Sequence, residues 1–224
     1  MRASRITGRV FGFAGAGAAL AACAGESDPA PPPAPLDEAA VAARSAPIAQ
    51  GFAADLKTQL TSALQAGGPK NAVSVCQQVA PALAEAASEQ SGAEVRRIAA
   101  RNRNPAGGVP GEMQAQYDEL AAQPIADGAP ARRIWRAEDG RVHFMSAIPM
   151  AEQPCSTCHG KDIDPDLKAH IESLYPEDAA TGFAPGDLRG ALLITWPAGS
   201  FGAEGAGAGA KAGAKAGAKA GEGA

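Results

Sequence analysis

The stretch RRIWRAEDGRVHFMSAI, residues 132–148, carries the clearest fold signal in this chain. Two strand-like runs, 132–136 and 141–148, lie on either side of Glu138-Asp139-Gly140. An Asp-Gly pair between such runs is typical of a tight β-hairpin, because glycine adopts the positive φ angle that the turn requires. The stretch therefore predicts two adjacent antiparallel strands.

Helices are predicted on the N-terminal side of this hairpin. Asp37 opens the first helix, and Gly67-Gly68 ends it. Its apolar face is formed by residues at helical spacing: Ile48, Phe52, Leu56, Leu60 and Leu64. A second helix begins near Pro69 and places Cys76 on its inward face. Pro81 lies within this helix, and we expect it to bend the axis because proline lacks a backbone N–H.

Shorter elements complete the prediction. They are a strand over 94–100, a loop over 101–111, a helix over 112–122, a helix over 166–175 and a closing strand over 188–196. Helices thus come first and strands later, interrupted by a loop that carries the cysteine motif described below. This order predicts an α+β fold in which N-terminal helices are followed by an antiparallel sheet.

The N-terminal residues 1–22 have the character of an export signal. Arg2, Arg5 and Arg9 supply positive charge, and the apolar stretch 10–20 is too short to span a membrane. Leu-Ala-Ala-Cys, ending at Cys23, resembles the bacterial lipobox, whose cysteine is acylated. The alternative is an ordinary cleavage site beside an unrelated cysteine. The interpretation we carry forward is a lipid anchor at Cys23, on the periplasmic side of the outer membrane.

The remaining chain divides by composition. Residues 23–36 form a Pro-rich tether, 37–197 form one domain, and 198–224 form a Gly/Ala/Lys-rich tail predicted to be disordered. The formal net charge is -4, and the domain has no basic patch. The sequence therefore gives no electrostatic support to nucleic-acid binding.

The chemistry of this domain is predicted by Cys155-Ser156-Thr157-Cys158-His159, a complete C-x-x-C-H motif. In such a motif two thiols attach a haem covalently, and the adjacent histidine ligates its iron. One motif predicts one haem c, attached at Cys155 and Cys158 and ligated by His159. Gly160 follows, where we expect a side chain to crowd the macrocycle.

Two other interpretations of the motif are weaker. A redox dithiol usually opens a helix in a βαβ context, which is missing here. A structural zinc site needs four ligands, generally in two pairs, and the chain has no second C-x-x-C. The second axial ligand of a haem stays open, with these candidates: Cys76, Met113, His143, Met145, Met150 and His170. Considered alone, Cys76 is more typical of a small buried apolar residue than of a ligand.

Five blocks of sequence, taken in order, carry a resemblance to a known family. They are VCQQVAP (75–81), RNRNP (101–105), CSTCHG (155–160), YPEDAATGF (175–183) and GDLRGA (186–191). Together, across residues 40–197, they resemble the single-haem c-type proteins that have a PAS-like fold and a cysteine axial ligand. The resemblance implies a PAS-like antiparallel sheet against the haem, with Cys76 as the second iron ligand.

The chain departs from that family pattern in one loop. Residues 105–112 lack the second asparagine and the tryptophan that relatives usually have there, so the role of this loop is open. Arg189 is a candidate partner for a haem propionate, and an ion pair with Asp178 or Asp187 is the alternative.

Two functions follow from a haem with a histidine and a cysteine ligand. One is redox or small-ligand sensing in the cell envelope, with a partner protein that the sequence does not identify. The other is electron transfer by a membrane-tethered cytochrome. The residues form no recognisable pair of nucleophile and base, so no enzymatic activity is predicted.

Overall fold

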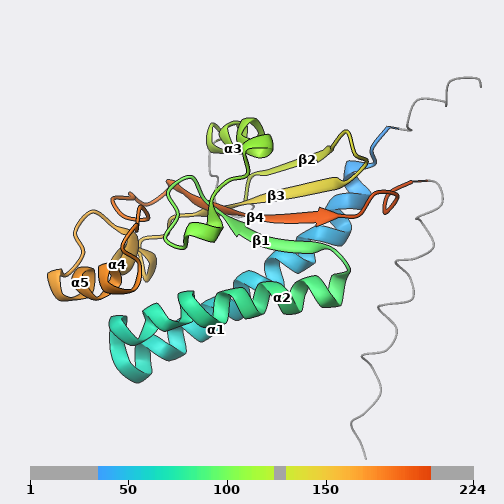
Figure 1. Cartoon of the computed structure of the whole chain (residues 1–224). Coiled ribbons are helices and arrows are strands. Elements are labelled where there is room, and N and C mark those ends of the chain that lie inside the picture. Colours follow the sequence, from blue (N-terminus) through green and yellow to red (C-terminus); the bar gives the residue numbers. More distant parts are fainter. Residues whose placement is uncertain (1–34, 124–129, 203–224) are drawn as a thin grey trace, which may run out of the picture. The chain divides into compact units, whose positions relative to one another are not determined.

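The computed structural model describes residues 35–123 and 130–202 (Figure 1). The predictions for the export signal, for Cys23 with most of the tether, and for residues 203–224 of the tail lie outside the described residues. No helix of the described part is long and apolar enough to cross a membrane.

Four strands form one antiparallel sheet in the order β1-β4-β3-β2. They are β1 (Glu94–Ile98), β2 (Arg132–Arg136), β3 (Val142–Pro149) and β4 (Leu188–Trp196). The predicted hairpin is confirmed: Arg136 pairs with Val142, and Gly140 turns the chain with a φ of 81°. With the N-terminal helices, this sheet confirms the predicted α+β class.

The N-terminal helices are α1 (Glu38–Ser74) and α2 (Ala80–Ser91), joined by a π-helical turn over Val75–Val79. The Asp37 side chain caps α1 by accepting the N–H of Ala40 at 3.0 Å. Helical geometry breaks at Gly67 and Gly68, where the end of the first helix was predicted. Just ahead of Pro81, where a bend was expected, the helix has a π turn in which Ala80 N–H bonds to the carbonyl of Val75.

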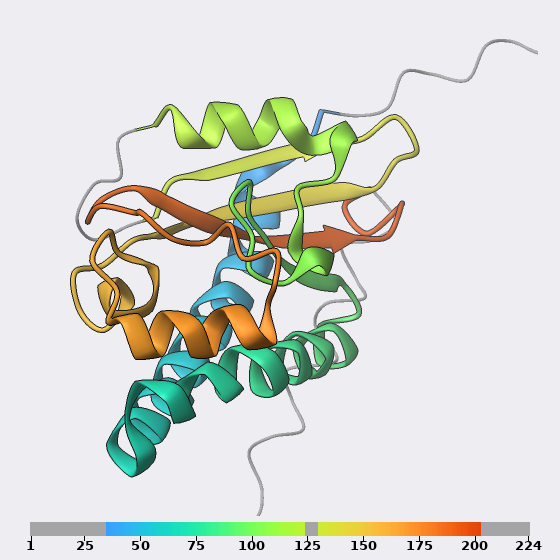
Figure 2. The same ribbon diagram turned by 60° about the vertical axis from the view of Figure 1, so that its left-hand side comes forward.

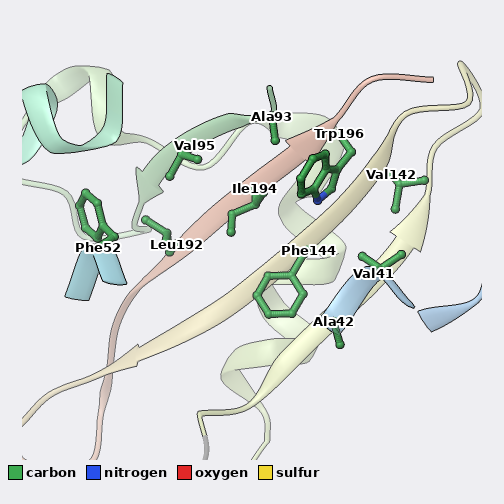
Figure 3. Close-up of a cluster of buried hydrophobic side chains, with 10 residues drawn as sticks. All are labelled: Val41, Ala42, Phe52, Ala93, Val95, Val142, Phe144, Leu192, Ile194 and Trp196. Carbon is green, nitrogen blue, oxygen red and sulfur yellow. The ribbon is translucent and has the colours of Figure 1, made fainter. Parts of the chain in front are cut away.

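The sheet is covered on both faces (Figures 1 and 2). On one face α1 and α2 pack on alternate strand residues, and this cluster includes Phe52, Phe144, Ile194 and Trp196 (Figure 3). On the other face, Tyr117 and Leu120 of α3 (Gln114–Ala121) pack on the intervening strand residues. Residues of β4 therefore contribute to both layers of the core.

The chain between β3 and β4 contains α4 (Cys155–His159) and α5 (Pro165–Leu174). The cysteine motif was expected on a loop; that is wrong, because its residues form a helical turn of their own. The predicted domain bound at residue 197 stays a prediction, and packed residues continue a few positions beyond it. Arg44 lies 4.0 Å from the ring centroid of Trp196 and 4.6 Å from that of Phe201, so the packed structure continues to Phe201.

Gly190 allows β4 to approach β1, and replacing it tests this pairing. A Cβ atom at Gly190 would lie 2.7 Å from the carbonyl oxygen of Ile98. We expect Gly190→Ala to lower the free energy of unfolding by about 1–3 kcal/mol, because the strand backbones must separate. Urea unfolding measures this. The control is Gly51→Ala in α1, where the added Cβ meets nothing within 4 Å and should raise stability slightly. Equal stability of Gly190→Ala and its parent would contradict the packing argument.

Candidate functional site

The four residues predicted to hold the cofactor line one cavity of about 480 Å³. They are Cys76 from the π turn and Cys155, Cys158 and His159 from α4. Part of the cavity wall is the apolar face of α1 that the sequence predicted, formed by Phe52, Leu56, Leu60 and Leu64. The tertiary structure thus brings together residues that lie about 80 positions apart in the chain.

Backbone hydrogen bonds hold the motif turn from two sides. Gly160 N–H donates to the carbonyl of Ser156 at 2.9 Å, closing the turn. A Cβ atom on Gly160 would lie only 2.5 Å from that carbonyl oxygen. The turn itself therefore requires this glycine, and the expected crowding of a macrocycle stays a prediction. Gly182 and Phe183 donate to the carbonyls of Gly160 and His159 at 2.8 and 3.0 Å, so the segment 180–183 runs along the motif.

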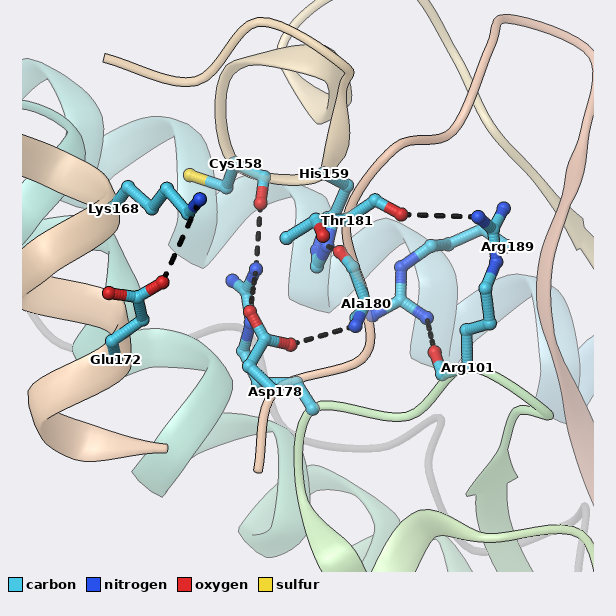
Figure 4. Close-up of polar contacts among 10 residues, drawn as sticks. Arg101, Cys158, His159, Lys168, Glu172, Asp178, Ala180, Thr181 and Arg189 are labelled. Carbon is cyan, nitrogen blue, oxygen red and sulfur yellow. Dashed lines mark hydrogen bonds and ion pairs between the residues drawn. The ribbon is translucent and has the colours of Figure 1, made fainter. Parts of the chain in front are cut away.

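The imidazole of His159 has one nitrogen engaged by the backbone. Its Nδ1 lies 2.7 Å from the carbonyl oxygen of Ala180 (Figure 4). Because a carbonyl only accepts, Nδ1 carries the proton and Nε2 keeps a free lone pair. Burial, followed by the positive charges of Arg189 and Arg103, lowers the pKa of His159 well below its usual value. The side chain is therefore a neutral imidazole with Nε2 as a possible metal ligand.

Cys76 lies close to the motif in space. It lines the 480 Å³ cavity and an adjoining one of about 410 Å³, which His159 also lines. Burial raises the pKa of the Cys158 thiol, and the neighbouring Cys76 and Cys155 raise it further, while Arg103 lowers it. All three thiols are free of disulfide bonds. Cys76 is thus available as a sulfur ligand beside the motif.

The other candidate axial ligands lie elsewhere. His143 is buried, with Nδ1 3.0 Å from Thr195 Oγ1 and its ring stacked on Trp135. Met113 and Met145 belong to the cluster under α3. Met150 packs with Ala180 and Phe183, and His170 is on α5. None of these five side chains lines either cavity that contains Cys76 and His159.

Arg103 and Arg189 both line the two cavities with a buried, unsatisfied Nε, and of these two only Arg189 has no carboxylate partner in the described structure. Arg189 is 9% exposed, and burial lowers its pKa to about 10. The alternative ion pairs are not formed: Asp178 pairs with Arg103 at 3.0 Å and Asp187 with Arg101 at 3.9 Å.

Arg103 is a site residue that the sequence analysis did not single out. Its Nη2 donates to the carbonyl of Cys158 at 2.7 Å, inside the cysteine motif. The feature of the sequence that could have revealed Arg103 is its position in RNRNP (101–105), one of the blocks that carry the family resemblance. Periodicity could not reveal its role, because a loop arginine is ordinarily solvated.

The described residues contain no group of three or more His, Cys, Asp or Glu side chains arranged to hold a metal ion directly. A structural zinc site at Cys155 and Cys158 therefore finds no second pair of ligands in this part of the chain. The arrangement instead offers an apolar cavity with two adjacent thiols, one imidazole nitrogen, a further thiol and a buried cation.

These features define an α+β protein with a cysteine- and histidine-lined apolar cavity between its N-terminal helices and its sheet. The family model described as Tll0287-like matches residues 35–197, and the chain belongs to the Tll0287-like family. This confirms the resemblance that the sequence blocks carried.

One solved structure can be compared. It is described as the crystal structure of the cyanobacterial heme-protein Tll0287, is 27% identical, and matches 53% of this chain and 69% of its own with a TM-score of 0.42. No curated protein matches the chain.

Proposed function

We propose that this protein binds one haem c, attached through Cys155 and Cys158, with His159 Nε2 and the Cys76 sulfur as the iron ligands. The observation that carries the proposal is that all four side chains line the same apolar cavity. The solved relative, described as a heme-protein, supports the class of cofactor.

The residues present fit a haem on three independent grounds. The cavity wall on α1 is apolar, which suits a porphyrin face. Cys155 and Cys158 are free thiols within one helical turn, so both can reach one edge of a flat ligand. The unsatisfied Nε of Arg189 supplies a buried cation for a propionate. A bound haem supplies an iron that changes oxidation state and exchanges small ligands.

Within this class, sensing is the function we favour, because of where Cys76 lies. It is the second residue of the π turn between α1 and α2, a backbone form often found at functional sites. The thiolate is the ligating form of cysteine, and a protonated thiol binds metal weakly. A proton taken up at Cys76 sulfur would free the π turn, and this movement could be read by a partner protein. Electron transfer, the alternative, requires Cys76 to stay in place.

We further propose that the protein acts in the cell envelope. A lipid at Cys23 would anchor it to the outer membrane on the periplasmic side, and the Pro-rich residues 23–36 would separate the domain from the surface. The partner is a redox or signalling protein and not a nucleic acid. The proposal concerns a haem-binding protein and not an enzyme.

Covalent attachment is tested by the double variant Cys155→Ala with Cys158→Ala, produced in a host that matures c-type cytochromes. We expect complete loss of pigment that resists acid-acetone extraction and loss of the haem mass from the intact protein, because both thioethers are gone. Cys23→Ala is the control and should keep the haem. Extraction-resistant pigment in the double variant would place attachment elsewhere.

The role of Cys76 is tested by electron paramagnetic resonance of the ferric protein. We expect the parent to give a low-spin thiolate signal and Cys76→Ala to lose it, because the sulfur ligand is removed. Met150→Leu, a buried candidate outside the cavity, should leave the signal unchanged. A Cys76→Ala spectrum identical to the parent's would remove this cysteine from the site.

The same pair of proteins separates the two functions. Voltammetry that shows slow, hysteretic cycling in the parent but fast cycling in Cys76→Ala would support ligand exchange and sensing. Fast, reversible cycling in the parent would instead support electron transfer.

The lipid anchor is tested by fractionation of cells that express the full chain. We expect Cys23→Ala to leave the membrane fraction for the soluble periplasmic fraction, because acyl chains hold such proteins to a bilayer. Cys76→Ala is the matched cysteine control and should stay with membranes. A Cys23→Ala protein that remains in the membrane fraction would contradict the anchor.

A further inference from the structure

A buried ion pair lies beside the cysteine motif. Arg103 Nη2 is 3.0 Å from Asp178 Oδ2, and the two side chains are only 5% and 3% exposed. In every other ion pair of the described residues, both side chains are at least 40% exposed. Arg103 follows β1 and Asp178 follows α5, so the pair joins two segments that are distant in sequence.

Each partner of this pair makes a second contact, and both contacts lead to the motif; Figure 4 labels Asp178, Ala180, Cys158 and His159. Arg103 Nη2 also donates to the carbonyl of Cys158 at 2.7 Å. Asp178 Oδ1 accepts the N–H of Ala180 at 2.8 Å, and the carbonyl of Ala180 accepts from His159 Nδ1 at 2.7 Å. The contacts form a closed path from Cys158 through the ion pair and Ala180 to His159.

The cost of burying this pair suggests a role beyond stability. Two desolvated charges often stabilise a fold no better than apolar residues of the same volume. Here, however, both charges are used to hold peptide groups. Asp178 accepts the N–H of Ala180, whose carbonyl accepts from the His159 imidazole. Arg103 donates to the carbonyl of Cys158, the residue just before His159.

We propose that Arg103 and Asp178 are positioning residues that orient the His159 imidazole. The pair holds the Ala180 carbonyl against Nδ1, which selects the Nδ1–H tautomer and leaves Nε2 as the ligating atom. The part of this inference that concerns iron ligation rests on the proposed function. Hydrogen bonds of this kind set the tautomer and the ring orientation of metal-binding histidines.

The first test uses the full chain without haem and therefore does not depend on haem loading. Long-range ¹H–¹⁵N nuclear magnetic resonance, with the His159 signals assigned through His159→Gln, reports the tautomer. We expect the Nδ1–H form to dominate in the parent and to lose that dominance in Asp178→Asn. Glu172→Gln, which breaks the exposed Lys168–Glu172 pair, is the control and should match the parent. A parent in the Nε2–H form would overturn the inference.

A second variant separates positioning from stability. Asp178→Asn leaves the Arg103 charge buried without a partner and can unfold the protein. Arg103→Met with Asp178→Val removes both charges and leaves the summed side-chain volume nearly unchanged, so we expect it to fold. Its melting temperature should lie below the parent's, because Cys158 O and Ala180 N–H lose their partners. In this double variant, as in Asp178→Asn, we expect a mixture of the Nδ1–H and Nε2–H tautomers of His159. A folded double variant with the parent's tautomer would show that the pair is structural only.

The haem-loaded protein gives the second readout. We expect the double variant to keep covalent haem, because Cys155 and Cys158 are intact. The fraction of ferric protein without imidazole ligation should rise roughly 10–100-fold. Parent protein that takes up no haem would refute the proposed function, while the tautomer measurement would still decide the orientation of His159. A loaded double variant with the parent's ligation would refute the positioning role alone.

Discussion

The pairing of β3 with β4 is the constraint on which the site depends. Between Pro149 and Leu188, which face each other in the sheet, the chain leaves the sheet and returns. Hydrogen bonds of 2.8 Å from Met150 N–H to Asp187 O and from Gly186 N–H to Met150 O close the base of this excursion. The motif residues Cys155, Cys158 and His159 lie within this excursion, while strand residues such as Phe144 and Leu192 line the same cavity from the sheet.

The other half of the site comes from the N-terminal helices, and the two halves meet over the sheet. The apolar face of α1 packs on β3 and β4 near Trp196, and farther along α1 the same face lines the cavity. The helix therefore contributes to the core at one end and to the site at the other. Cys76 occupies the π turn that follows, where the regular hydrogen-bond pattern changes ahead of Pro81. Helix, turn and thiol thus follow one another along the chain on the same side of the cavity.

Charge in this site is concentrated where the backbone needs support. Arg103 and Asp178 neutralise each other and hold peptide groups of the motif and of its neighbouring segment. Arg189 has no carboxylate partner among the described ion pairs, and like Arg103 it has an Nε without a hydrogen-bond partner. Both buried arginines donate to backbone carbonyls, Arg103 to Cys158 and Arg189 to Arg101, but only Arg103 has a carboxylate partner.

The sequence by itself determined the elements whose signals are local. The Asp-Gly turn, the helix break at Gly67-Gly68 and the strand over 188–196 follow from backbone preferences and side-chain periodicity, and the structure has them all. The C-x-x-C-H motif likewise predicted Cys155, Cys158 and His159 as haem-site residues without reference to the fold. The family resemblance implied Cys76 as a ligand, and the tertiary structure placed it in the same cavity as the motif. Only the tertiary structure decided that Arg103 rather than Arg189 pairs with Asp178, and that Phe201 packs on the domain. These are contacts between residues far apart in sequence, and a chain's local preferences do not encode which distant groups meet once burial and hydrogen bonding are satisfied together.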